Sequence, residues 1–238
     1  VCSSDLRPAI LIRGSGTIVT QNKFFGDGAD SFMGIDVWGA GNVISDNVLD
    51  AFCDVGIRIY CNNANVKPDN NIVSNNSIRG IGLPSDTSNT YRCGILLDNT
   101  GASGFTGTTI CGNAFGNKRS DRSMQYAILV NAVSGTPGDF RAIKDAVISN
   151  NAIQSTEISS DRKIAKLGAN SVNVVLANNA GYATTKIGTG VYSNGQIITH
   201  GLGVVPDFIS ISIGDGAAIN ATYDLVTETS FKIGRASC

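Results

Sequence analysis

The sequence is organised around a short pattern that it repeats six times. The clearest copy is NIVSNNSI, Asn71–Ile78, and each copy reads roughly apolar-x-x-Asn-x-apolar. The steps between the marker asparagines are 25, 29, 37, 38 and 28 residues, an irregular period typical of stacked supersecondary units with surplus residues in loops. The marker asparagines are Asn22, Asn47, Asn76, Asn113, Asn151 and Asn179.

A second short apolar element follows each of the first five copies. These runs alternate with period two, are rich in Ile, Val and Leu, and are bounded by Gly, Asn or Asp, so they predict strands. Two or more short strands per repeat, with no helix between them, predict a coil of parallel strands, a β-solenoid. The runs are Gly34–Trp38, Gly56–Tyr60, Gly94–Asp98, Ala127–Asn131 and the weaker Lys163–Leu167.

The marker asparagines are best explained by a structural role. The apolar residues beside them are buried only when one turn stacks on the next. At a fixed corner, Asn tolerates the left-handed backbone of a sharp bend. Stacked Asn side chains also form hydrogen-bonded ladders. We therefore assign these residues to the fold and not to catalysis.

The I-x-x-N-x-I and G-I-x-I repeats resemble those of right-handed parallel β-helix proteins in the pectate-lyase-like superfamily, and especially of bacteriophage tailspike and tail-fibre proteins. The resemblance covers about Ala9–Ala180. It implies an all-β fold, a right-handed parallel β-helix. It says little about activity, because one fold hosts many functions.

The two ends of the chain differ in character from the repeats between them. Residues 1–6 and 234–238 look like translated sequencing-adapter sequence, so we expect an internal piece of a longer protein. We expect the β-helix over 7–180, a linker over 181–190 and a small, truncated antiparallel β module over 191–233. In that module, the phrase ITHGLGVVPDFISISI resembles a C-terminal module of phage tail proteins, where it is associated with trimer formation or surface contact.

Composition narrows the partners and cofactors. Only 16% of residues are charged and the formal net charge is −1, which argues against nucleic acid as a partner. No apolar run of ~18 residues predicts a membrane span. No CxxC spacing and no nearby histidine accompany the four central cysteines, Cys53, Cys61, Cys93 and Cys111, so we expect no metal or cofactor. We expect buried thiols, and a disulfide between adjacent turns stays open as the alternative.

Two outward columns form the candidate site. In each G-I-x-I-x strand the Ile side chains point inward, so the intervening residues point outward and stack turn upon turn. Aromatic rings there would stack on sugars, while Asp and Arg would bind hydroxyl or uronate groups. The alternative is that both columns are ordinary solvent-facing residues, with a weak Asp36–Arg58 ion pair. One column is Asp36, Arg58, Leu96 and Leu129, the other is Trp38, Tyr60, Asp98 and Asn131, and the predicted carbohydrate-binding residues are Trp38, Tyr60, Arg92 and Asn131.

Two kinds of catalysis are conceivable. Hydrolysis needs two carboxyl groups roughly 5–9.5 Å apart, which Asp36 would form with Asp54 or Asp98. Elimination needs a base, for which Arg58 and Arg92 are candidates, but no carboxylate cluster marks a calcium site. The remaining candidates are expected to be solvated or structural: the loop acids Asp86, Asp121 and Glu157, and the single histidine, His200.

Two functions therefore remain open. The first is a tailspike-like depolymerase, a hydrolase or lyase acting on a bacterial surface polysaccharide. The second is a receptor-binding tail fibre or adhesin of the same fold without enzymatic activity. The resemblance implies a homotrimer located on a virion tail or outside the cell, without membrane insertion; a cellular pectate-lyase relative is disfavoured by the phage-like module and the missing calcium cluster.

Overall fold

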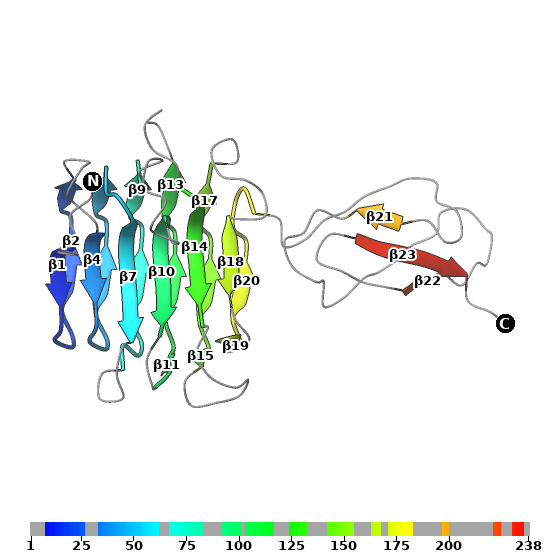
Figure 1. Cartoon of the computed structure of the whole chain (residues 1–238), viewed down its shortest axis with the longest axis horizontal. Helices are drawn as coiled ribbons and strands as arrows, with labels where there is room; N and C mark the ends of the chain where they lie inside the picture. The colour runs from blue at the N-terminus through cyan, green and yellow to red at the C-terminus, as the bar shows by residue number, and fades with distance from the viewer. Residues whose placement is uncertain are drawn as a thin grey trace. The chain divides into compact units, whose positions relative to one another are not determined.

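In the computed structural model the chain is all-β (Figure 1). Among the described residues there is no helix, and hence none long and apolar enough to cross a membrane. The structure describes residues 8–26, 33–61, 67–82, 92–100, 103–116, 124–132, 142–154, 163–167, 171–182, 197–199, 221–224 and 230–235.

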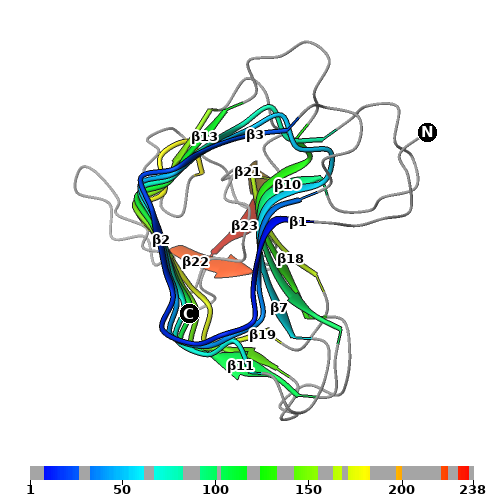
Figure 2. The same cartoon turned by 90° about the vertical axis from the view of Figure 1, so that its left-hand side faces the viewer.

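The first unit of the chain, Val1–Gly181, consists of stacked parallel sheets (Figures 1 and 2). Sheet A contains β1 (Pro8–Ile12), β4 (Met33–Val37), β7 (Val55–Cys61), β10 (Cys93–Asn99), β14 (Tyr126–Asn131) and β18 (Ile164–Leu167). Sheet B contains β2 (Ile18–Thr20), β5 (Val43–Ser45), β8 (Ile72–Ser74), β12 (Thr109–Cys111), β16 (Val147–Ser149) and β20 (Val175–Ala177). Sheet C contains β3 (Lys23–Phe25), β6 (Val48–Asp50), β9 (Ser77–Arg79), β13 (Ala114–Gly116) and β17 (Ala152–Ile153). A short sheet D contains β11 (Phe105–Thr106), β15 (Ile143–Lys144) and β19 (Ser171–Val172).

Each strand pairs in parallel with the equivalent strand one repeat away, which is the pattern of a β-solenoid. The register aligns the inward residues that the repeats predicted: Ile57 with Ile95, and Val73 with Ile110. These side chains are fully buried. Sheet D was not predicted.

The marker asparagines form a ladder at the corner between sheets B and C, as predicted. The backbone N–H and the Nδ2 of Asn76 both donate to Oδ1 of Asn113, each at 3.0 Å, and Asn113 donates in the same way to Oδ1 of Asn151, each at 3.0 Å. The Nδ2 of each buried marker also donates to a strand carbonyl, for example that of Asn113 to Val73 O at 2.9 Å. The ladder runs through Asn22, Asn47, Asn76, Asn113, Asn151 and Asn179.

The left-handed bend was predicted at the wrong residue. It lies one position before each marker, where φ is between 52° and 68°. The marker itself must present both its backbone N–H and its side chain to the next repeat, so the residue before it makes the turn. The left-handed residues at this corner are Gln21, Asp46, Asn75, Gly112, Asn150 and Asn178.

Close packing across the coil explains the glycine that opens three of the sheet A runs. A Cβ on Gly94 would lie 2.6 Å from the ring of Phe115 in sheet C and 2.7 Å from Ala127 O. A Cβ on Gly56 would meet Ile78 at 2.9 Å and Gly94 O at 2.6 Å. Since side chains at these positions would collide with the opposite sheet, the strand requires glycine there.

Of the second unit, Tyr182–Cys238, the structure describes Tyr182 and three strands. β23 (Ser230–Arg235) pairs antiparallel with β21 (Ile197–Thr199) and with β22 (Ala221–Asp224). β23 includes Gly234 and Arg235, which the sequence assigned to an adapter-derived end. Most of the expected linker and most of the phrase ITHGLGVVPDFISISI lie outside the described residues.

The cysteines of the described part of the first unit are thiols. They are Cys53, Cys61, Cys93 and Cys111, and the first three are buried. Burial raises the pKa of the Cys93 thiol far above its usual range, and the nearby charges of Asp98 and Asp54 act in the same direction. Cys93 therefore stays a protonated thiol, and the Sγ of Cys61 donates a hydrogen bond to the carbonyl of Ser103 at 2.9 Å.

Candidate functional site

The register of sheet A assembles both predicted columns. Asp36 lies beside Arg58, which lies beside Leu96, and Leu96 lies beside Leu129. In the second column Tyr60 lies beside Asp98, and Asp98 lies beside Asn131. Residues far apart in the sequence thus form two neighbouring columns across the strands of sheet A.

The expectation that these columns face solvent was wrong for most members. Asp36 is 2% exposed, Asp98 5% and Asn131 1%. Leu96 and Leu129 are also buried, because they pack into a hydrophobic cluster. Its members are Met33, Cys53, Val55, Cys93, Leu96 and Leu129, with Tyr126 and Ala165 packed against it.

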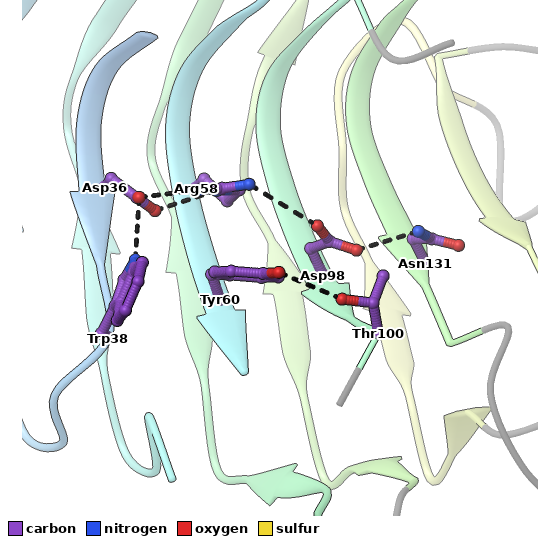
Figure 3. A network of polar contacts seen from close by, with 7 residues as sticks. All are labelled: Asp36, Trp38, Arg58, Tyr60, Asp98, Thr100 and Asn131. Atoms are coloured by element: carbon purple, nitrogen blue, oxygen red, sulfur yellow. Dashed lines mark hydrogen bonds and ion pairs between the residues drawn. The ribbon is translucent and has the colours of Figure 1, made fainter. Parts of the chain in front are cut away.

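Asp36 is held by two neighbours (Figure 3). Arg58 binds it with two hydrogen bonds, from Nε to Oδ1 at 2.9 Å and from Nη2 to Oδ2 at 2.8 Å. The indole Nε1 of Trp38 also donates to Oδ2 at 2.8 Å. Burial acts to lower the pKa of Arg58, but its hydrogen bond and charge interaction with Asp36, and the charges of Asp98 and Tyr60, leave that pKa raised, so Arg58 keeps its positive charge.

Asp98 continues the network on the other side of Arg58 (Figure 3). Its Oδ2 lies 3.9 Å from Nη1 of Arg58, and its Oδ1 accepts a hydrogen bond from Nδ2 of Asn131 at 2.9 Å. Burial raises the pKa of Asp98, and the charge of Asp36 acts in the same direction. The hydrogen bond from Asn131 and the charge of Arg58 act to lower this pKa, but it remains raised. One guanidinium group therefore lies between two buried carboxyl groups.

Aromatic rings form the more accessible part of the site. Trp38 and Tyr60 are half-buried and meet edge to face, with ring centroids 5.6 Å apart at 73°. Arg58 lies over the Tyr60 ring at 4.0 Å and Arg13 lies over the Trp38 ring at 5.2 Å, both within cation–π range. The hydroxyl of exposed Thr100 donates to the Tyr60 hydroxyl at 3.2 Å.

Two predicted site residues lie at the other end of the strands. Arg92 comes just before β10 and precedes Asp98 by a stretch of chain about 20 Å long at ~3.3 Å per residue. Its carbonyl accepts hydrogen bonds from the backbone of Gln125 and Tyr126. Asp54 comes just before β7, and its carbonyl accepts a hydrogen bond from Cys93. Their roles as base, acid or sugar ligand stay predictions.

Sequence reasoning missed two members of the network, Arg13 and Thr100. Extending the β1–β4 register from Leu11 beside Asp36 by two residues puts Arg13 next to Trp38. Thr100 follows Asp98 by two residues, so both point to the same side. The same period-2 rule that found the columns would have found both residues. Asp86, Asp121, Glu157 and His200 lie outside the described residues.

The site presents two aromatic rings, two guanidinium groups and the hydroxyls of Tyr60 and Thr100 next to one another. Within the described part of the chain, no group of three His, Cys, Asp or Glu side chains is arranged to hold a metal ion. No protein-family model matches the sequence, and neither a curated protein nor a solved structure matches it.

Proposed function

We propose that the outer face of sheet A, around Trp38 and Tyr60, binds a bacterial surface polysaccharide. In this proposal the chain is a phage tailspike-like protein, carried on a virion tail or released outside the cell. Its coil is a right-handed parallel β-helix, the hand favoured for connections between parallel strands. Copies of the chain assemble into a homotrimer.

The observation that supports binding is the fixed arrangement of Trp38 and Tyr60 by buried charge. Asp36 accepts from the Trp38 indole and orients Arg58, which in turn covers one face of the Tyr60 ring. Rings held this way lose little conformational entropy when a ligand binds. Planar rings bordered by guanidinium and hydroxyl groups suit a sugar, which has apolar faces and a polar edge.

Binding is better supported than cleavage. Both oxygens of Asp36 already accept hydrogen bonds, so its carboxylate is poorly suited to act as a nucleophile or a base. Asp98, with its raised pKa, is the better general acid, but Arg58 stands between the two carboxyl groups where a sugar would have to lie. Hydrolysis and elimination are thus secondary to a receptor-binding role.

Glycan binding tests the proposal directly. The wild-type protein would be titrated by biolayer interferometry against a panel of immobilised bacterial capsules and lipopolysaccharides. Trp38→Ala and Tyr60→Ala should each weaken binding about tenfold or more, the effect of a lost stacking contact worth ~1.5 kcal/mol. Phe25→Ala removes an exposed aromatic ring from sheet C and should leave binding unchanged.

The outcomes separate the candidate functions. Binding that all three variants retain would refute the site, and no binding across the panel would refute the proposal. New reducing ends in the same samples would indicate a hydrolase, and ultraviolet absorbance from unsaturated products would indicate a lyase. Binding without either product would identify a receptor-binding protein.

A further inference from the structure

Arg13 is the exposed cation of the candidate site. Its guanidinium carbon lies over the Trp38 ring, 5.2 Å from the centroid, and the residue is exposed. Within the described ranges, no carboxyl group forms an ion pair with Arg13. The side chain of Arg58, in contrast, is only 18% exposed and is already paired with Asp36 at 2.8 Å. Of these two cations, Arg13 is the one left to attract an anion from solution.

The backbone fixes Arg13 beside Trp38. The N–H of Trp38 donates to Ile12 O at 2.8 Å, which continues the pairing of β1 with β4 past the ends of both strands. The glycines that follow, Gly14 and Gly39, pass so close to each other that a Cβ on Gly39 would overlap Gly14 O. The backbone next to Arg13 is thus held on both sides, so a change in its contact with the ring must come from its side chain.

A sugar that stacks on Trp38 has to share the ring with Arg13. A cation over an exposed aromatic ring stabilises that arrangement by a factor of about two to five. A neutral sugar that displaces the guanidinium group offers it no stronger partner. A sugar with a carboxylate offers charge-assisted hydrogen bonds, about twice as strong as neutral ones, and both of its oxygens fit one guanidinium group.

We propose that Arg13 selects acidic polysaccharides at this site, because its guanidinium group leaves the Trp38 ring and binds a sugar carboxylate. The proposal rests on the suggested glycan binding at Trp38 and Tyr60. It names the class of polysaccharide, one that contains carboxylate-bearing sugars, and the residue that recognises it.

The two buried carboxyl groups of the site oppose such an anion only weakly. Asp36 is 2% exposed and its charge is balanced by Arg58. Asp98 lies on β10, three strands from β1, which is about 14 Å along the coil at ~4.8 Å per strand. That separation exceeds the Debye length of about 8 Å at physiological salt. The nearest described charge to an anion at Arg13 is therefore favourable.

The test compares one polysaccharide with and without its carboxylates. Carbodiimide activation followed by borohydride reduction converts uronic acids into the corresponding neutral sugars. A uronate-containing capsule that the wild-type protein binds, and its carboxyl-reduced form, would each be immobilised and titrated by biolayer interferometry. Wild type should bind the acidic form at least about tenfold more tightly than the reduced form.

Variants of Arg13 assign the discrimination to this residue. Arg13→Gln should weaken binding of the acidic form about tenfold, and it should bind the reduced form as well as wild type or up to about fivefold better, because the ring is uncovered. Arg13→Lys keeps the charge without the planar guanidinium group and should recover part of the loss. Lys23→Gln is the matched control, since it removes an exposed cation from sheet C and should leave both affinities unchanged.

The variants must first show wild-type circular dichroism, which the exposure of Arg13 and Lys23 leads us to expect. Equal affinity of wild type for the two forms would overturn the proposal. So would equal losses for both forms in Arg13→Gln, because Arg13 would then only support the ring.

Trp38→Ala, titrated in parallel, separates this test from the proposed function. If Trp38→Ala weakens binding of both forms and Arg13→Gln weakens neither, the glycan site stands and the selection of acidic sugars is refuted. If Trp38→Ala weakens neither form, the glycan site itself is refuted.

Discussion

Replacing Asn113 with alanine should test the ladder at its most buried point. Asn113 is 0% exposed, and its Oδ1 accepts from both the backbone N–H and the Nδ2 of Asn76. Its own Nδ2 donates to Val73 O and to Oδ1 of Asn151. Asn113→Ala removes these side-chain bonds and deprives buried groups of the preceding repeat, at Asn76 and Val73, of a partner.

The expected loss of stability follows from those groups. A buried donor or acceptor left unpaired costs about 1–3 kcal/mol, and the backbone N–H of Asn76 and the carbonyl of Val73 are each deprived of a partner. The free energy of unfolding should therefore fall by roughly 2–5 kcal/mol. Asn22→Ala is the matched control, because Asn22 occupies the exposed first position of the same column and bonds to Asn47.

Urea unfolding followed by circular dichroism measures both variants. We expect a large decrease in midpoint for Asn113→Ala and a change below about 1 kcal/mol for Asn22→Ala, whose groups reach water. The unfolding slope should stay constant, so that midpoints report stability. Equal losses in the two variants, or a loss below about 1 kcal/mol at Asn113, would refute the assignment of stability to buried ladder bonds.

Three further predictions concern packing and charge. Gly94→Ala places a Cβ 2.6 Å from the ring of Phe115 and should lower the free energy of unfolding by about 1–3 kcal/mol in the same urea assay. Gly14→Ala is the control: the atom nearest to its Cβ is 3.9 Å away, so its free energy of unfolding should change little. Arg58→Met leaves the buried Asp36 carboxylate without its cation and should lower the free energy of unfolding by on the order of 3 kcal/mol. Arg58→Lys should recover part of that loss. An unchanged thermal midpoint in Arg58→Met would contradict the buried ion pair. Because burial raises the pKa of Asp98, the native protein binds a proton at this carboxyl group more tightly than the unfolded chain does. The protonated group therefore contributes to stability in acid, and this contribution is lost as the pH rises through the raised pKa. The free energy of unfolding of wild type minus that of Asp98→Asn should fall from acid to neutral pH, and a rising difference would refute the shift.

The repeats alone predicted most of the first unit's strands and their register. An inward Ile or Val at period two fixes which residues are buried, and stacking then aligns Asp36 with Arg58 and Tyr60 with Asp98. The left-handed residue was misplaced by one position, because an Asn-rich corner does not reveal which member bends the chain and which one bonds.

The candidate site was only half predictable. The sequence shows that Leu96 and Leu129 share a column, but not that Met33, Cys53 and Val55 gather there to exclude water. Burial of an outer face depends on contacts between residues remote in sequence, which periodicity does not contain. The shift in the pKa of Asp98 follows from this burial and was equally invisible.

The hydrogen bonds of the ladder form at the same length whether the loop between two markers is short or long. Asn22 and Asn47 are 25 residues apart, Asn113 and Asn151 are 38 apart, and both pairs close the same backbone-to-side-chain bond at 3.0 Å. Since the entropy of closing a loop grows slowly with length, by about 0.6 kcal/mol per doubling, added residues disturb the bond little. Loops of very different length can therefore connect the strands while the hydrogen bonds of the ladder stay in place.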